Sequence, residues 1–227
     1  NKRAFNAKYN EVNTYYSYMP LDDDLLNDNT SDADIMFVLD DSGSMRYNDP
    51  NNGRKSATSQ FVEKLTENDR IGLIKFTTSA TILSHLGYAV DTAKTALINN
   101  LDRLYNNGGT DGSTGLNAAL NQLDSDSRAK CVIFLTDGVD TQTRYSYNSI
   151  IERAKENGIT IFTIGLGSDV NGSLLDNIAT STYGKYFSID DTSELYDCFL
   201  EIKELTIDYV VDSNNDGISD YNTWKLC

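Results

Sequence analysis

The chain has 227 residues and a formal net charge of −15, from 34 acidic and 19 basic side chains. This length accommodates one large α/β domain with extensions, and a hydrophobic content of 39% excludes global disorder. A surface this acidic repels phosphate backbones and anionic lipid. We therefore expect no nucleic-acid partner. No stretch has the apolar length of a membrane span, and we expect no membrane insertion.

Residues 1–32 are polar and lack a sustained period, which predicts an N-terminal extension. From 33 to 207, strand and helix patterns alternate, and 208–227 forms an Asp-rich connector. The predicted strands are 35–39, 70–76, 80–86, 131–136, 159–165 and 185–189, and the predicted helices are 54–66, 92–104, 115–123, 148–157, 173–181 and one that opens at Asp191. The alternation predicts a doubly wound, mainly parallel sheet flanked by helices, with 80–86 as a hairpin edge.

Carboxylate and hydroxyl groups gather directly after the first predicted strand. Asp40, Ser42 and Ser44 lie in a turn that Gly43 permits. Open α/β sheets bind their ligands at the carboxyl ends of strands, where this turn lies. The three side chains are hard oxygen donors, which suit Mg²⁺, Ca²⁺ or Mn²⁺. Because the turn contains no thiolate or imidazole, we do not expect zinc or copper.

Two later segments add donors of the same kind. A glycine-rich loop presents Thr110, and the strand predicted at 131–136 ends in Asp137, followed by Gly138. Right-handed crossovers bring the ends of strands 35–39 and 131–136 to the same rim of a parallel sheet. Asp40 and Asp137 can therefore approach one ion, although they are far apart in the sequence.

These three segments, in this order, resemble the von Willebrand factor A domain with its metal-ion-dependent adhesion site. The resemblance covers residues 33–207 and implies that Ser42, Ser44 and Thr110 bind a divalent cation directly, while Asp40 and Asp137 act largely through water. Neutral hydroxyl ligands leave the cation a strong Lewis acid, which can capture an acidic side chain of a partner. The implied function is a non-catalytic adhesion or protein-binding module that uses Mg²⁺, Mn²⁺ or Ca²⁺.

The connector holds a second candidate metal site. Carboxylates or carboxamides at positions 1, 3, 5 and 9, with Gly at position 6, match the start of a calcium loop. The candidate Ca²⁺ ligands are Asp212, Asn214, Asp216, Ile218 and Asp220. Position 12 is Thr223 instead of the Glu of an EF-hand, and the segment resembles the Asp-rich calcium repeats of thrombospondin type 3. The alternative interpretation is an exposed polar linker.

The three cysteines and the composition bear on location. Cys131 lies within an apolar run and is expected to be a buried thiol, whereas Cys198 and Cys227 either form a disulfide or remain free. We expect a monomeric fragment of a longer, bacterial, extracellular or cell-surface protein, because the chain begins at Asn1 and carries the Asp-rich segment. Its expected partner is a protein, such as a host matrix or surface protein.

Two other functions remain open at this stage. One is an intracellular module of the same family that assists an ATPase or a protein-processing complex. The other is a metal-assisted hydrolase, which would need a base. The single histidine, His85, falls in the predicted hairpin edge, away from the metal rim.

Several residues beside the predicted ligands have open roles. Asp111 and Asp140 either tune the charge of the site or are solvated loop carboxylates. Tyr47, Tyr145 and Tyr147 are either exposed partner anchors at its rim or loop tyrosines without a role.

Overall fold

The computed structural model of the chain describes residues 32–123 and 128–210, with side chains to 206. Residues 1–31 of the predicted N-terminal extension lie outside the described residues, as do the candidate calcium ligands Asp212, Asn214, Asp216, Ile218 and Asp220. The calcium site therefore stays a prediction.

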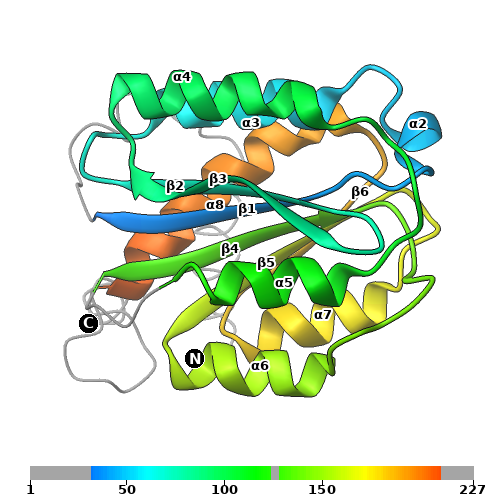
Figure 1. Ribbon diagram of the computed structural model, residues 1–227. Coiled ribbons are helices and arrows are strands. Elements are labelled where there is room, and N and C mark those ends of the chain that lie inside the picture. The colour runs from blue at the N-terminus through cyan, green and yellow to red at the C-terminus, as the bar shows by residue number, and fades with distance from the viewer. Residues whose placement is uncertain (1–31, 124–127, 211–227) are drawn as a thin grey trace, which may run out of the picture. The chain divides into compact units, whose positions relative to one another are not determined.

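Six strands form one sheet in the order β3-β2-β1-β4-β5-β6 (Figure 1). The strands are β1 (Ala33–Asp40), β2 (Arg70–Phe76), β3 (Ala80–Tyr88), β4 (Ala129–Thr136), β5 (Ile159–Leu166) and β6 (Tyr186–Ile189). All neighbouring pairs are parallel except β2 and β3, which pair antiparallel. The predicted parallel sheet with a hairpin edge is confirmed.

Helices cover both faces of this sheet. They are α2 (Met45–Asn48), α3 (Gly53–Lys64), α4 (Asp91–Asn100), η2 (Leu101–Arg103), α5 (Gly112–Leu120), α6 (Tyr147–Glu156), α7 (Gly172–Ser181), η3 (Thr192–Glu194) and α8 (Leu195–Val210). Figure 1 shows α3, α4 and α8 on one face and α5, α6 and α7 on the other. The predicted doubly wound fold is therefore confirmed.

Strand β1 lies in the middle of the sheet and is buried on both faces. On one face, the ring of Phe37 lies 5.9 Å from the rings of Phe61 in α3 and Phe199 in α8. On the other face, Met36 and Val38 belong to the core under α5, α6 and α7. Burial on both faces explains why this strand is a continuous apolar run instead of an alternating one.

The helix boundaries differ from the predicted ones where polar side chains cap a helix. Helix α5 begins at Gly112, three residues before the predicted start, because Asp111 accepts a hydrogen bond from the Thr114 N–H. Asp191 likewise accepts from the Ser193 N–H, but it begins the 3₁₀ turn η3, and α8 follows at Leu195. The short helix α2 was not predicted.

Cys131 is buried in β4, as predicted, and burial raises its pKa to about 12. Cys198 is also buried and has no disulfide partner among the described residues. Because Cys227 lies outside them, pairing of Cys198 with Cys227 stays a prediction. Within residues 32–123 and 128–210, no helix is long and apolar enough to cross a membrane.

Candidate metal centre

The site begins where β1 and β4 end side by side. The parallel register pairs Leu39 with Leu135, which places Asp40 beside Thr136. One carboxylate oxygen of Asp40 accepts the Thr136 hydroxyl at 2.6 Å, and the other accepts the Ser42 backbone N–H at 2.7 Å. These two bonds fix the orientation of the Asp40 carboxylate and tighten the turn that follows β1.

The turn hydroxyls connect β1 to the residue after β4. The hydroxyl oxygens of Ser42 and Ser44 lie 3.0 Å apart, and Ser44 donates to one carboxylate oxygen of Asp137 at 2.7 Å. The side-chain amide of Asn48, in α2, donates to the other Asp137 oxygen at 3.1 Å. The structure thus brings Asp40, Ser42, Ser44 and Asp137, four of the five predicted ligands, into one hydrogen-bonded group.

The loop that carries Thr110, the fifth predicted ligand, is held against the same turn. The Gly43 N–H donates to the Gly108 carbonyl at 3.1 Å, and the Thr141 N–H, beyond β4, donates to the Thr110 carbonyl at 2.8 Å. Gly108 has a φ of 89°, a conformation that glycine adopts without strain. The Thr110 side chain is buried, and none of its hydrogen bonds in the described part of the chain reaches the other four residues.

The two carboxylates of the site are fully buried and have no cationic partner in the part of the chain that the structure describes. Among the described side chains, the salt bridges of the molecule involve other carboxylates than Asp40 and Asp137. Desolvation by burial, with a contribution from the Asp137 carboxylate, raises the pKa of Asp40 to about 6 against the lowering effect of hydrogen bonds from Ser42 and Thr136. The fold therefore concentrates negative charge here without compensating it.

The donor set fits a hard divalent cation. It consists of two carboxylates and three hydroxyls, all of which are oxygen ligands of the kind that Mg²⁺, Mn²⁺ and Ca²⁺ prefer. Hydroxyls make up most of the set, and the described residues contain no group of three or more His, Cys, Asp or Glu side chains that could hold a metal ion. A cation here would supply the positive charge that Asp40 and Asp137 lack.

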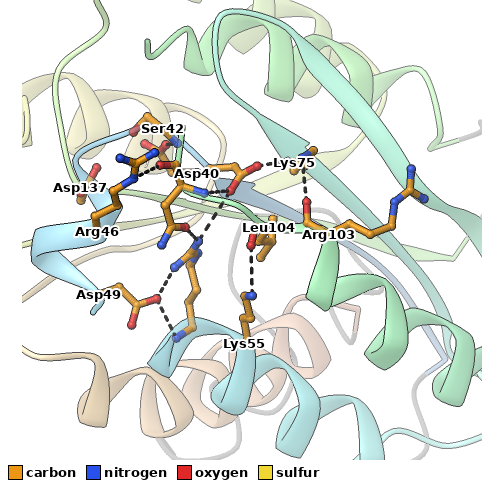
Figure 2. A network of polar contacts seen from close by, with 12 residues as sticks. Asp40, Ser42, Arg46, Asp49, Lys55, Lys75, Arg103, Leu104 and Asp137 are labelled. Atoms are coloured by element: carbon orange, nitrogen blue, oxygen red, sulfur yellow. Dashed lines mark hydrogen bonds and ion pairs between the residues drawn. The ribbon is translucent and has the colours of Figure 1, made fainter. Parts of the chain in front are cut away.

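Asp41, which the sequence analysis did not single out, anchors the turn from behind. It is fully buried and accepts a hydrogen bond from the Lys75 ammonium at 2.8 Å and from the Asn106 N–H at 2.7 Å. A guanidinium nitrogen of Arg54 lies 4.0 Å from the same carboxylate. Figure 2 shows this network of polar contacts beside Asp40 and Ser42.

Arg54 is the centre of that network. Its fully buried guanidinium donates to the Asp49 carboxylate and to the side-chain oxygen of Asn106, and its Nε has no hydrogen-bond partner among residues 32–123 and 128–206. One cation thus ties α3 to the turn after β1 and to the loop before Thr110. A sequence signal existed, since Arg54 is three residues before Ala57 and seven before Phe61, on the apolar stripe of its helix.

Asp111 and Asp140 are not solvated loop carboxylates. Asp111 is fully buried and caps α5, and it also accepts the Ser113 hydroxyl at 2.5 Å. Asp140 is half-buried and accepts the Gly112 N–H at 2.9 Å and the Tyr147 hydroxyl at 2.6 Å. Burial raises the pKa of Asp140. Both residues hold the loops in place around the site.

The candidate tyrosines and the single histidine differ in their exposure and contacts. Tyr47 and Tyr145 are exposed, as predicted, whereas Tyr147 is half-buried, packs against the core and spends its hydroxyl on Asp140. The prediction that Tyr147 is exposed and could anchor a partner is therefore wrong. His85 is exposed on the edge strand β3, and its ring nitrogen Nδ1 pairs with Gln122 at 2.8 Å.

Comparison with known proteins identifies the fold family. The von Willebrand factor type A domain family matches residues 34–201. The uncharacterized protein YfbK of Escherichia coli is 27% identical over 196 residues, and the match spans 83% of this chain but only 34% of that protein. The chain thus spans about a third of the length of this curated relative.

Two solved structures show the same fold. The von Willebrand factor type A protein from Catenulispora acidiphila has a TM-score of 0.68 and 26% identity, over 80% of this chain and 43% of that one. Proximal thread matrix protein 1 from the mussel byssus, with a zinc-occupied MIDAS motif, has a TM-score of 0.66 and 23% identity, over 78% of this chain and 48% of that one. With a family match over residues 34–201, the chain belongs to the von Willebrand factor type A domain family.

Proposed function

We propose that this chain is a metal-dependent protein-binding module. In this proposal, a divalent cation held by Asp40, Ser42, Ser44, Thr110 and Asp137 captures an acidic side chain of a partner protein. The observation that carries it is the buried pair Asp40 and Asp137, which has hydroxyl and amide partners but no cationic one among the described residues.

The residues of the chain prepare this site in advance. Thr136 and the Ser42 N–H hold the Asp40 carboxylate, and Asp137 orients the Ser44 hydroxyl. The bound cation would supply a Lewis-acidic position for an external carboxylate. Because Ser42, Ser44 and Thr110 carry no formal charge, the site cancels less of the charge of the cation than a carboxylate cage would.

We propose Mg²⁺ as the ion, with Mn²⁺ or Ca²⁺ as alternatives. Hard oxygen donors favour these ions over zinc. Since the mussel protein has a zinc-occupied MIDAS motif, Zn²⁺ is included in the titration below.

We also propose that the module is non-catalytic and works outside the cell or on its surface. His85, the one histidine of the chain, pairs with Gln122 on β3, and no described contact joins it to the site. Both carboxylates of the site are already engaged by hydroxyl and amide donors. The acidic composition supports an extracellular location, and the intracellular module remains the alternative.

The first test measures the cation itself. The protein is stripped with EDTA and titrated with Mg²⁺, Mn²⁺, Ca²⁺ and Zn²⁺ by calorimetry and thermal unfolding. At a cation concentration 100 times Kd, we expect about 2.7 kcal/mol of stabilisation. Thr110→Ala should weaken this effect, while Thr180→Ala, at an exposed position of α7, should not. No cation binding in the parent chain would overturn the proposal.

The second test measures the partner. The chain is applied to a panel of extracellular-matrix and cell-surface proteins, in Mg²⁺ and in EDTA. Binding that disappears in EDTA and in Thr110→Ala supports the proposal. Binding that survives both would place recognition away from the cation.

A further inference from the structure

Three loops surround the site and present an unusual surface for so acidic a chain. They are 41–52, 104–111 and 137–146, and all of their residues are described. Their five carboxylates point inward or are hydrogen-bonded: Asp41, Asp49, Asp111 and Asp137 are buried, and Asp140 is half-buried against Gly112 and Tyr147. The exposed formal charges that remain on these loops are two arginines, Arg46 and Arg144. We call the surface formed by these three loops the arginine side of the rim.

Arg46 is held in place at this rim. It extends from α2, which directly follows Ser44, and its Nε donates to the Asn106 carbonyl at 2.7 Å (Figure 2). Asn106 is itself fixed by Arg54 and Asp41. The guanidinium is therefore anchored through one nitrogen, and this anchor leaves its two terminal nitrogens for a ligand.

Arg144 lies in the loop that follows Asp137. Its backbone N–H donates to Asp111 and to the Ser113 hydroxyl, both at 3.2 Å, so the loop is fixed while the side chain is exposed. Arg46 follows Ser44 and Arg144 follows Asp137, in the two loops that are joined by the Ser44–Asp137 hydrogen bond. Each of the two loops that provide Ser44 and Asp137 therefore carries one exposed arginine for a ligand that reaches the cation.

Exposed apolar side chains occur on the same three loops. Of the large hydrophobic side chains that are exposed in the described residues, those on these loops are Tyr47, Tyr105, Val139 and Tyr145. Tyr47 is 83% exposed and packs against little of its own chain. Large aromatic side chains beside arginines are the residue types that contribute most to the affinity of protein interfaces.

The other half of the rim has the opposite charge. The loops after β5 and β6, residues 167–171 and 190–194, expose Asp169, Asp190, Asp191 and Glu194 and contain no lysine or arginine. A Cβ on Gly167 would meet Asn48, and one on Gly53 would meet Thr192, so these acidic loops border α2 and α3. The rim thus has an arginine side and an acidic side, with the predicted ligands Asp40 and Asp137 between β1 and β4.

We propose that the partner is an acidic protein segment with at least two carboxylates and a neighbouring apolar side chain. This inference rests on the proposed function. One carboxylate binds the cation, and the others pair with Arg46 and Arg144, so the segment lies along the arginine side. The exposed tyrosines contact its apolar residue. The acidic side repels it and prevents binding in the other direction.

Three labelled peptides test this proposal on the full chain in Mg²⁺. The first has one Asp in a Gly–Ser background, the second has three Asp, and the third has three Asp and one Phe. We expect the second to bind about 10-fold more tightly than the first, and Arg46→Gln with Arg144→Gln to reduce this ratio to about twofold. Lys155→Gln, at the end of α6 away from the rim, is the matched control for charge. Tyr47→Ser should weaken only the advantage of the third peptide.

The outcomes separate this inference from the proposed function. If one-Asp and three-Asp peptides bind equally, and both bindings are lost in EDTA, the cation captures a carboxylate but the arginine side does not select an acidic segment. If binding persists in EDTA, the proposed function fails. If heparin oligosaccharides bind through the arginines more tightly than any of the peptides and without Mg²⁺, the partner is a sulfated glycan and the protein segment is wrong.

Discussion

The two ends of β1 treat buried carboxylates in opposite ways. At its start, Asp34 is fully buried and accepts from Arg70 and Arg128, at 2.7 and 2.8 Å. At its end, Asp40 is equally buried, but its partners among the described residues are the neutral donors of Ser42 and Thr136. The fold therefore compensates one carboxylate with its own arginines and leaves the other without a cation.

Asp41 shows that this difference is not due to a shortage of cations at the carboxyl rim. Adjacent residues of a strand point to opposite faces of the sheet. Asp41 thus meets Lys75 and Arg54 on one face, while Asp40 meets only neutral donors and Asp137. Asp34 and Asp41 are thus paired with cations of the chain, whereas Asp40 and Asp137 have none among the described residues, which is the basis for the proposed cation site.

Replacement of Arg54 should produce the largest loss of stability. Arg54→Met removes the only guanidinium that joins Asp49 and Asn106, and it leaves buried carboxylates with fewer partners. We expect a loss of about 3–5 kcal/mol in the free energy of unfolding, measured by urea denaturation in EDTA. Arg153→Met is the control, since Arg153 pairs with neutral Asn117 and Asn121 near the surface. Equal losses in both variants would contradict a special role for Arg54.

Asp34→Ala tests the paired end of β1. The two guanidiniums that lose their carboxylate are 15% and 18% exposed and can regain water, so the loss should be smaller, about 2–3 kcal/mol. The same urea series measures it, with exposed Asp102→Ala as the control. A loss below about 1 kcal/mol would mean that these ion pairs are no more useful than surface ones.

Asp40→Asn tests the unpaired end and sharpens the comparison. In EDTA, we expect the free energy of unfolding to stay unchanged or to rise by about 1 kcal/mol, because a desolvated carboxylate without a cation is removed. The stabilisation by Mg²⁺ should disappear. If this variant in EDTA loses as much stability as Asp34→Ala, the two ends of β1 do not differ in the way described.

The smallest expected effect is on the chemical reactivity of the two buried thiols, Cys131 in β4 and Cys198 in α8. Burial raises the pKa of Cys131 to about 12 and that of Cys198 to about 11. At pH 8 both thiols stay protonated, so they should react with a disulfide reagent far more slowly than an exposed thiol of pKa about 8.5. Labelling of a Cys227→Ser variant, with and without urea, measures this. Rapid labelling of the native protein would mean that the helices over the sheet open readily.

Much of the fold followed from local pattern. Apolar runs placed all six strands within a few residues of their observed bounds, and the strand at 70–76 was predicted at its observed bounds, Arg70–Phe76. The start of α5 was wrong because the cap Asp111, instead of the apolar period, determines where the helix begins. The helix α2 has four residues, too few for a period to be seen.

Some residues of the candidate site were likewise predicted from the sequence, and others were not. Asp40, Ser42, Ser44 and Asp137 were predicted from residue types at strand ends, and the structure brings them together. Arg54 was missed because an arginine in the first turn of an amphipathic helix is ordinarily solvated. Tyr147 was misjudged because its sequence neighbours do not reveal that its hydroxyl reaches Asp140.

By itself, the sequence determined which segments become strands and helices and which oxygen donors stand at strand ends, because periodicity and turn chemistry act over a few residues. Tertiary structure alone decided which carboxylates have a cation of their own. Asp34 and Asp40 on β1 and Asp41 directly after it are the same residue type, and the neighbours across the sheet, Arg70 and Lys75 from β2 and Thr136 from β4, distinguish them. Charge compensation is a property of contacts between distant segments, which no local pattern encodes.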